Sequence, residues 1–222
     1  MSSQDKFFTP LMSHQIDQLN LVKTWLGSGS VNIFGMPFSG KDTIGVKLAQ
    51  LLGASFLSSG DIIRGAANKL SQNAVDITNS GGITPTAEFQ DLVFPYFSLP
   101  EFAGRALVLS MVGRLSEEVS PIREVTAASG HPIKVVLSLE ITDNEVRTRW
   151  EAARDSRRRA NRADDQTLEV VEHRIQEFRQ NVLPTVDIYR KLGLLVTING
   201  KQGRNAVLGD VVRSLCRFAL SH

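Results

Sequence analysis

A glycine-rich loop that ends in a lysine is the first feature of the sequence that could do chemistry. The stretch NIFGMPFSGKDT places Gly35, Gly40 and Lys41 at the spacing of a phosphate-binding loop. In such a loop, backbone N–H groups surround phosphate oxygens, the next helix presents its positive end, and the lysine adds a point charge. Asp42 follows the lysine where a serine or threonine is usual, and Thr43 comes one residue later. The loop predicts a phosphate site, and a plain strand-to-helix turn is the alternative.

Arginines follow two apolar runs further along the chain. Arg64 comes shortly after the run SFLS, and Arg114 comes shortly after ALVLS. Because α/β folds bind ligands at the carboxyl ends of their strands, both guanidinium groups are expected near the glycine loop. Arg174 adjoins the apolar positions of a helical pattern, so its stem can lie along the buried stripe while its fork enters a cleft. A solvated or salt-bridged surface arginine is the alternative for each of them.

Five short apolar, β-branched runs predict the strands that position these residues. The runs do not alternate strictly, and longer segments with helical periodicity separate them, which is typical of strands buried on both faces of a parallel sheet. The expected fold is therefore α/β with three layers. The runs are VNIF from Val31, SFLS from Ser55, ALVLS from Ala106, IKVVLSL from Ile133 and LLVTI from Leu194.

Helical patterns lie before, between and after these runs. Ile44 to Leu52 form an apolar stripe directly after the glycine loop. Leu168 to Val182 predict a long helix that is disturbed near Pro184 and ends at Gly193. An additional N-terminal helix is expected from the apolar spacing of Ile16 to Leu26.

Length and composition favour one domain without a strongly charged partner. The 222 residues are 42% hydrophobic, and 25 Lys and Arg against 23 Asp and Glu give a net charge of +2. The lone Cys216 excludes an internal disulfide and suits a reducing compartment. No run has the length of a signal peptide or a membrane span. A cytoplasmic protein is expected, with no membrane partner and a monomer as the working assumption.

Motifs spread along the chain resemble the adenylate kinase and nucleoside monophosphate kinase family. That family's loop reads GxPGxGKGT, and its second strand ends in STGDLLR, where this chain has SSGDIIR from Ser58. NSGGITPTAEF from Asn79 is similar to its Gly-x-Leu-Val-x-Asp-Glu stretch, and GRALVLSMVGR from Gly104 to its Gly-x-x-Leu-Asp-Gly-Phe-Pro-Arg strand end. RADD from Arg162 is similar to the family's Gly-Arg-x-Asp-Asp signature. The segment that begins at Arg174 is similar to the family's last helix and strand. The resemblance covers nearly the whole chain from the first strand onward.

The resemblance implies a single P-loop kinase domain, residues 1–222, with a five-stranded parallel sheet and two smaller lobes. A helical insertion, residues 61–103, is the implied lobe for the nucleoside monophosphate. Residues 150–162 are the implied short lid, because the arginine-rich run there has no cysteine and histidine set for zinc. A basic patch for RNA is the rival explanation of that run, although interleaved aromatic residues for specific stacking are missing. Residues 1–30 hold the additional helix.

The activity implied by the resemblance is transfer of the γ-phosphoryl group of ATP to a nucleoside monophosphate, with Mg²⁺ as the cofactor. Such a reaction depends on alignment and charge neutralisation more than on covalent chemistry. The implied catalytic residues are Lys41, Arg114, Arg162 and Arg174. The implied ATP-binding residues are Gly35, Ser39, Gly40, Lys41, Asp42, Thr43, Arg149, Arg154 and Gln202. The implied residues for the monophosphate are Ser59, Arg64, Ile83, Thr84, Met111, Arg114, Glu118, Arg162 and Arg174.

Several positions depart from the family pattern. Ser110 stands where the family has an aspartate, while Asp42 adds a carboxylate to the loop, so Asp42 is a candidate contact for magnesium-bound water at a relocated site. Asp61 is the implied metal contact that the chain retains, and capping of the next helix is its alternative. Phe38 replaces a loop glycine, which predicts a negative φ and crowding of the phosphates. Met111 to Gly113 replace Gly-Phe-Pro and change the wall of the acceptor pocket.

Glu118 bears on the base of the acceptor. It lies four residues after Arg114, where the family pattern has a glutamine. An ionised carboxylate offers two acceptors, which suit the N1 and N2 donors of guanine better than adenine, so GMP is a candidate beside AMP. An exposed helix residue is the alternative. Two rival functions also stand: a nucleotide-binding protein of this fold without catalysis, and a kinase for another small phosphorylated acceptor.

Overall fold

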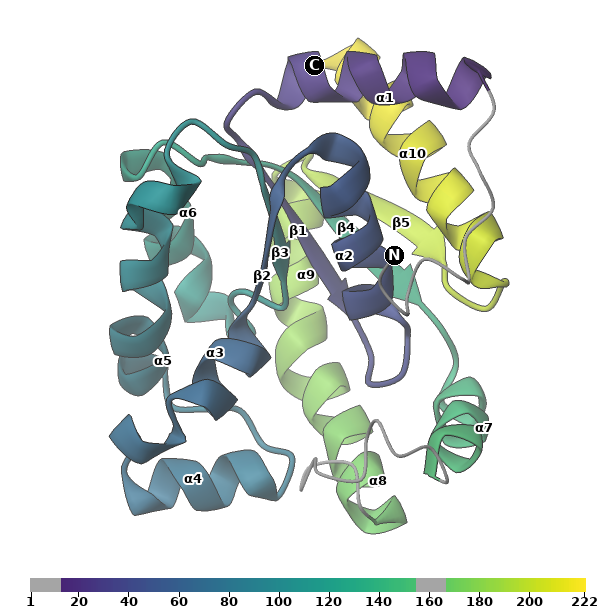
Figure 1. The fold of residues 1–222 in the computed structure, drawn as a ribbon. Helices are drawn as coiled ribbons and strands as arrows, with labels where there is room; N and C mark the ends of the chain where they lie inside the picture. The colour runs from purple at the N-terminus through teal and green to yellow at the C-terminus, as the bar shows by residue number, and fades with distance from the viewer. Residues whose placement is uncertain (1–12, 155–166) are drawn as a thin grey trace.

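A five-stranded parallel sheet lies at the centre of the computed structural model, which describes residues 13–154 and 167–222 (Figure 1). Across the sheet the strands stand in the order β2-β3-β1-β4-β5. Each lies on one of the five apolar runs, so the predicted α/β fold is confirmed. The strands are β1 (Ser30–Gly35), β2 (Ser55–Ser58), β3 (Leu107–Ser110), β4 (Ile133–Glu140) and β5 (Leu195–Asn199).

The carboxyl ends of the strands meet at one edge of the sheet, because all paired strands are parallel. In the central strand β1, Ile33 pairs with Ser110 of β3, and Gly35 pairs with Leu139 of β4. The loop after β1 is therefore flanked by the segments that follow β3 and β4. Open α/β sheets bind their ligands at this edge.

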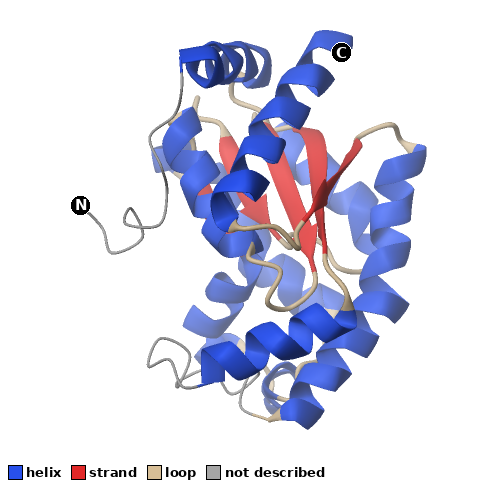
Figure 2. Cartoon of the chain, turned by 90° about the vertical axis from the view of Figure 1, so that its right-hand side faces the viewer, coloured by secondary structure: helices blue, strands red, loops and turns tan. Residues whose placement is uncertain are grey.

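Three helices, α1, α2 and α10, cover one face of the sheet (Figures 1 and 2). Their bounds are α1 (Ser13–Leu26), α2 (Lys41–Leu52) and α10 (Arg204–Ser221). Helix α1 packs against α10, and its Leu19, Val22 and Leu26 are buried in the apolar cluster that α2 and α10 share. The predicted N-terminal helix is thus present. Its apolar stripe is shorter than predicted, because Ile16 is 48% exposed.

The opposite face is covered by α6, α9 and a helical insertion between β2 and β3. The bounds are α3 (Ser59–Gly65), α4 (Gln72–Asn79) and α5 (Thr86–Val93) in the insertion, then α6 (Val119–Ala128) and α9 (Leu183–Lys191). Short 3₁₀ turns at Ala67–Lys69, Phe94–Ser98 and Pro100–Phe102 complete the insertion. Phe34 of β1, Leu109 of β3 and Tyr189 of α9 belong to the second apolar cluster. In the described part of the chain, no helix combines the length and the apolar character that crossing a membrane requires.

Two further helices, α7 (Asp143–Arg154) and α8 (Leu168–Glu177), lie beyond the carboxyl edge of the sheet (Figure 1). A third apolar cluster joins them, and it contains Val146 and Trp150 of α7 and Val171 and Ile175 of α8. Phe38 of the glycine loop packs into the same cluster. The glycine loop therefore packs against the helices that border the expected lid, and most of that lid lies outside the described residues.

The long helix predicted before the last strand is divided by a wider turn. A π-helical turn, Phe178–Val182, joins α8 to α9, and Pro184 lies in the first turn of α9. Proline has no N–H, and its ring clashes with the carbonyl four residues earlier in a regular α-helix, so a locally wider turn relieves the contact. The predicted disturbance near Pro184 is confirmed and has this form.

Candidate active site

The glycine loop connects β1 to α2 in the strand–loop–helix order that phosphate binding requires. Gly40 has φ 87° and is the N-cap of α2, a left-handed conformation that glycine adopts without strain. A Cβ atom at Gly35 would lie 2.6 Å from Ser39 Oγ and 3.0 Å from the carbonyl oxygen of Leu139. A larger residue at that position would force Ser39 to shift. The predicted spacing thus has a structural reason at both glycines.

Ser39 carries an unsatisfied hydroxyl inside the loop. The residue is 3% exposed, and its Oγ has no hydrogen-bond partner among the described residues. A buried hydroxyl without a partner costs about 1–3 kcal/mol, so such groups usually have a partner or a functional reason. A phosphate oxygen in the loop would accept this hydrogen bond.

Phe38 has a positive φ of 61°, so the predicted negative φ is wrong. Its ring is 8% exposed, packs into the third apolar cluster, and is not among the residues that line the clefts described below. A left-handed non-glycine residue costs on the order of 1–3 kcal/mol. Burying a phenylalanine ring contributes about 1.5–3 kcal/mol, which offsets that cost. Met111, at the other family glycine position, has φ 55°.

Lys41, Arg114 and Arg174 line one open cleft, although they come from separate parts of the chain. Lys41 begins α2, Arg114 follows β3, and Arg174 lies on α8. One ammonium and two guanidinium groups around one cleft make it a strong site for phosphate groups. The other lining residues are Gly35, Pro37, Gly81, Ile83, Met111, Glu177, Phe178 and Val182.

A second cleft shares Arg114 and Arg174 with the first one and adds Arg64. The other residues around it are Gly60, Ile63, Thr78, Gly81, Gly82 and Thr84. Ile83 and Thr84, both predicted for the monophosphate, therefore line different clefts. Adjoining clefts with shared arginines can hold two phosphorylated ligands with their charged ends together.

Gly81 belongs to both clefts and was not predicted as a site residue. Its φ is 90°, and a Cβ atom there would lie 2.6 Å from Cγ of Arg174. Glycine at this position therefore lets the helical insertion approach the stem of Arg174. The motif NSGGIT was a signal for this role, because paired glycines indicate close backbone approach.

Asp42 and Ser110, two departures from the family pattern, meet at the edge of the sheet. Ser110 is 1% exposed, and its hydroxyl donates a hydrogen bond of 2.6 Å to Oδ1 of Asp42. The serine thus orients the additional carboxylate in the first turn of α2. Asp61 instead lies 2.5 Å from Nη2 of Arg64. The N-cap of α3 is Ser58, whose side chain accepts the N–H of Asp61, and Asp61 lies in the first turn of the helix.

Glu118 is 1% exposed, so the alternative of an exposed helix residue is wrong. Its Oε2 accepts the backbone N–H groups of Arg114 at 2.7 Å and Leu115 at 3.1 Å. Thr185 donates to the carbonyl oxygen of Arg114 at 2.9 Å, so the backbone that carries this arginine is held on both sides. Burial raises the pKa of the Glu118 carboxyl above its ordinary value of 4.5, although these two N–H groups act to lower the pKa. Only Oε1 remains without a hydrogen-bond partner in the described residues.

The structure also gives the positions of most other residues predicted for the site. Ser59 is fully buried, and its hydroxyl donates to the carbonyl of Met111 at 2.7 Å. Gln202 follows β5 and donates to Asp210 at 2.6 Å. Thr43 is half-buried in the first turn of α2. Arg154 is the last residue of α7, and Arg162 lies outside the described residues. The parts that these residues take in ligand binding stay predictions.

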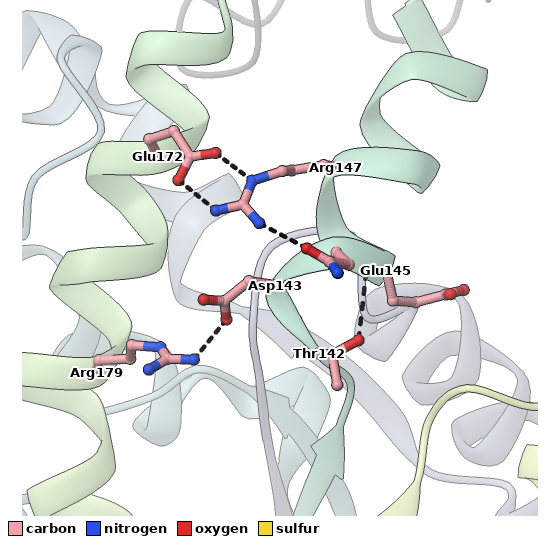
Figure 3. A network of polar contacts seen from close by, with 7 residues as sticks. Thr142, Asp143, Glu145, Arg147, Glu172 and Arg179 are labelled. Atoms are coloured by element: carbon pink, nitrogen blue, oxygen red, sulfur yellow. Dashed lines mark hydrogen bonds and ion pairs between the residues drawn. The ribbon is translucent and has the colours of Figure 1, made fainter.

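Ion pairs connect α7 to α8 and the π turn (Figure 3). Arg147 forms a forked pair with Glu172, with Nε at 2.5 Å and Nη2 at 2.9 Å from the two carboxylate oxygens. The hydrogen bond from Arg147 lowers the pKa of the Glu172 carboxyl. Arg179 lies 2.8 Å from Asp143. Sequence reasoning missed these pairs, because arginine and glutamate on helical surfaces are common and their partners depend on how the helices pack.

Comparison with known proteins gives relatives that share one name. No protein-family model matches the chain. The adenylate kinase of Kocuria rhizophila is 26% identical over 188 residues, which are 83% of this chain and 97% of that protein. The adenylate kinase of Methylobacterium radiotolerans is 28% identical over 189 residues, 82% of this chain and 94% of that protein. The adenylate kinase of Methanosarcina mazei is 23% identical over 215 residues, 86% of this chain and all of that protein.

These relatives match most of the chain, and the chain spans nearly the full length of each of them. The parallel sheet, the loop between β1 and α2 and the cationic clefts at one edge agree with that likeness. The chain is therefore similar to adenylate kinases along most of its length and diverges from these relatives in sequence.

Proposed function

We propose that the protein is a nucleoside monophosphate kinase, which transfers the γ-phosphoryl group of ATP to a nucleoside monophosphate. The observation that carries the proposal is the convergence of Lys41, Arg114 and Arg174 on one cleft. In phosphoryl transfer, the rate comes from alignment and from charges aimed at the migrating group, so such a cluster is the main requirement. The names of the relatives support the same reaction class.

Each cationic residue has a proposed role in this reaction. Lys41 and the N–H groups of the loop hold the phosphates of ATP. Arg64 and Arg114 hold the phosphate of the acceptor. Arg174 lines both clefts, so we assign it to the migrating phosphoryl group. Arg162 is assigned to the same group from the sequence pattern alone, and the ATP-binding and acceptor-binding sets named from the sequence belong to this proposal.

Magnesium is the proposed cofactor, and the residues present suit a metal ion that arrives with the nucleotide. Among the described residues there is no group of three metal-ligating side chains. Such a group is not required, because Mg²⁺ in kinase sites keeps waters and takes most other ligands from substrate phosphates, with one or two carboxylates. Asp42, oriented by Ser110 and adjacent to Lys41, can accept hydrogen bonds from those waters. When bound, the ion neutralises charge on the β- and γ-phosphates.

Replacing Asp42 with asparagine tests this metal contact. The carboxylate repels phosphates directly and attracts the waters of the ion, so the substitution is expected to have opposite effects with and without magnesium. ATP affinity without magnesium should rise several-fold, and affinity for the magnesium complex should fall about tenfold, the size of one charge-assisted hydrogen bond. Calorimetric titration with each form of ATP measures both constants.

A matched control separates charge from orientation. Ser110→Ala keeps the Asp42 carboxylate and removes only the hydrogen bond to it. We therefore expect a smaller loss of affinity for the magnesium complex of ATP than in Asp42→Asn, and no gain of affinity for ATP without magnesium. Equal affinities of wild type and Asp42→Asn for both forms of ATP would eliminate Asp42 as the metal contact.

The acceptor is proposed to be a purine nucleoside monophosphate. Adenylate is the acceptor in the names of the relatives, and an acceptor-only carboxylate at Glu118 favours guanine donors. Recognition of GMP by two acceptor oxygens would need both oxygens of Glu118, whereas Oε2 already accepts two backbone N–H groups. Only Oε1 is without a partner among the described residues, and Glu118 is buried and is not among the residues that line either cleft, so AMP and GMP are both retained.

Rates with AMP, GMP, CMP and UMP, measured in a coupled diphosphate assay, test the reaction and its acceptor together. Both purine nucleotides are expected to react at least about tenfold faster than the pyrimidine nucleotides, since a single base hydrogen bond is worth this much. Glu118→Gln should raise the ratio of the AMP rate to the GMP rate, because the amide adds a donor for N1 of adenine.

The rival functions give different results in the same assay. A binding protein without catalysis would bind ATP and form no diphosphate with any acceptor. A kinase for another phosphorylated acceptor would fail with all four monophosphates. A Glu118→Gln variant with an unchanged ratio would show that this residue does not contact the base.

A further inference from the structure

Arg149 of α7 contacts two loops that are far from it in the sequence. Its Nη1 donates to the carbonyl oxygens of Phe38 at 3.3 Å and Ser39 at 3.4 Å, and its Nη2 donates to the carbonyl of Gly200 at 2.8 Å. Glu145, one turn earlier on α7, holds Nε at 2.6 Å. The side chain is 26% exposed. One guanidinium group thus connects α7, the phosphate loop and the loop after β5.

Arg149 contacts the part of the phosphate loop whose carbonyl groups need hydrogen-bond donors. A loop that turns its N–H groups toward an anion directs carbonyl groups to its outer side, where another donor must meet them. Phe38 also has the strained φ of 61°, and Ser39 carries the unsatisfied hydroxyl. Arg149 therefore binds the outer side of the residues whose inner side faces the expected phosphate.

Apolar contacts act in the same place. The ring of Phe38 packs in the third cluster with Val146 and Trp150, which lie on either side of Arg149 along α7. The loop after β5 is packed closely as well, because a Cβ atom at Gly200 would lie 2.9 Å from Cγ2 of Ile141. The Phe38 ring packs the phosphate loop against α7, and the Arg149 guanidinium group orients the carbonyl groups of that loop.

We infer that Arg149 is a positioning residue that holds the phosphate loop in its binding conformation before the nucleotide arrives. The inference rests on the proposed function, because the loop is taken to bind the phosphates of ATP. It differs from the direct contact with ATP implied by the family resemblance. In a direct contact, Arg149 would change the ligand-bound protein and leave the ligand-free loop unaltered.

Amide hydrogen exchange of the ligand-free protein distinguishes these roles. In Arg149→Met, the amides of residues 38–41 are expected to exchange about tenfold faster than in wild type, because the loop opens locally more often. The affinity for the magnesium complex of ATP should fall by a similar factor, and the affinity for the acceptor should stay unchanged. Arg149→Lys should restore part of both effects, since an ammonium group replaces some of the donors but lacks the fork.

Arg147→Met is the matched control, because Arg147 lies on the same helix and its fork is paired with Glu172 of α8. We expect this variant to leave loop exchange as in wild type. Faster exchange across β4 and α10 as well as the loop in Arg149→Met would mean a general structural role and would overturn the inference. Unchanged loop exchange with weaker ATP binding would also overturn it, in favour of direct contact.

Failure of the proposed function is recognised separately. If wild type bound no ATP, the kinase proposal would fail, while exchange in the ligand-free loop would still show whether Arg149 holds its conformation. If ATP bound and loop exchange did not respond to Arg149→Met or Arg149→Lys, the kinase proposal would stand and only the positioning role would be lost.

Discussion

Replacing Lys41 with methionine is expected to lower kcat by at least about a thousandfold, the size of effect seen when a charge aimed at a transferring phosphoryl group is removed. Methionine keeps the unbranched stem at the start of α2 and removes the charge that lines the first cleft. The loss should appear with every acceptor, because the donor phosphates are common to all of them. Single-turnover measurements at saturating ATP separate this effect from weaker binding.

Lys47→Met is the control for that prediction. Lys47 lies on the same helix but is not among the residues around either cleft. Its substitution should leave kcat within about twofold, as is usual for surface changes away from a site. If Lys41→Met retained more than a tenth of wild-type kcat, the loop would not hold the transferred phosphate, and the proposed function would lose its main support.

Arg174→Met is expected to lower kcat about 10³-fold to 10⁵-fold, the range found when an arginine that stabilises the transferring phosphoryl group is lost. The reason is its position, since Arg174 lines both clefts and can act on a group that passes from one to the other. Arg174→Lys should recover only part of the rate, because a point charge replaces a fork that contacts two oxygens. Affinity for ATP should change only a few-fold in both variants.

Arg179→Met provides the comparison for Arg174→Met. Arg179 lies in the adjoining π turn, is 56% exposed, and pairs with Asp143 away from the clefts. Near wild-type kcat is expected for this variant. If Arg174→Met raised KM for the acceptor and left kcat unaltered, the guanidinium group would bind the ground state, and its assignment to the migrating group would be wrong.

Local sequence patterns predicted the fold and the loop well, because these features depend on neighbours in the chain. The strands follow from apolar runs with helical segments between them. Gly40 has a left-handed backbone, and a Cβ atom at Gly35 would come too close to Ser39. The edge at which Arg64 and Arg114 gather follows from the parallel direction of the strands. For these features, tertiary packing determines where the strands and the loop lie but does not change the backbone conformation that the local sequence prefers.

Residues whose state depends on distant partners were predicted poorly. Phe38 adopts a glycine-like backbone because its ring packs against α7 and α8, more than a hundred residues later in the sequence. Glu118 lies in a segment that resembles an exposed helix start, yet it is buried because it binds the backbone of Arg114. The meeting of Asp42 with Ser110 depends on how α2 and β3 lie together at the edge of the sheet. No periodicity or spacing contains that information.

The π turn divides one long helical segment into α8 and α9, which have different contacts. In α9, Tyr189 and Val186 pack in the apolar cluster against the sheet. In α8, Arg174 lines the clefts. A wide turn is a weak point in the ladder of backbone bonds, so bending concentrates there and not along either helix. A rotation at this turn would move Arg174 relative to the sheet and to both clefts.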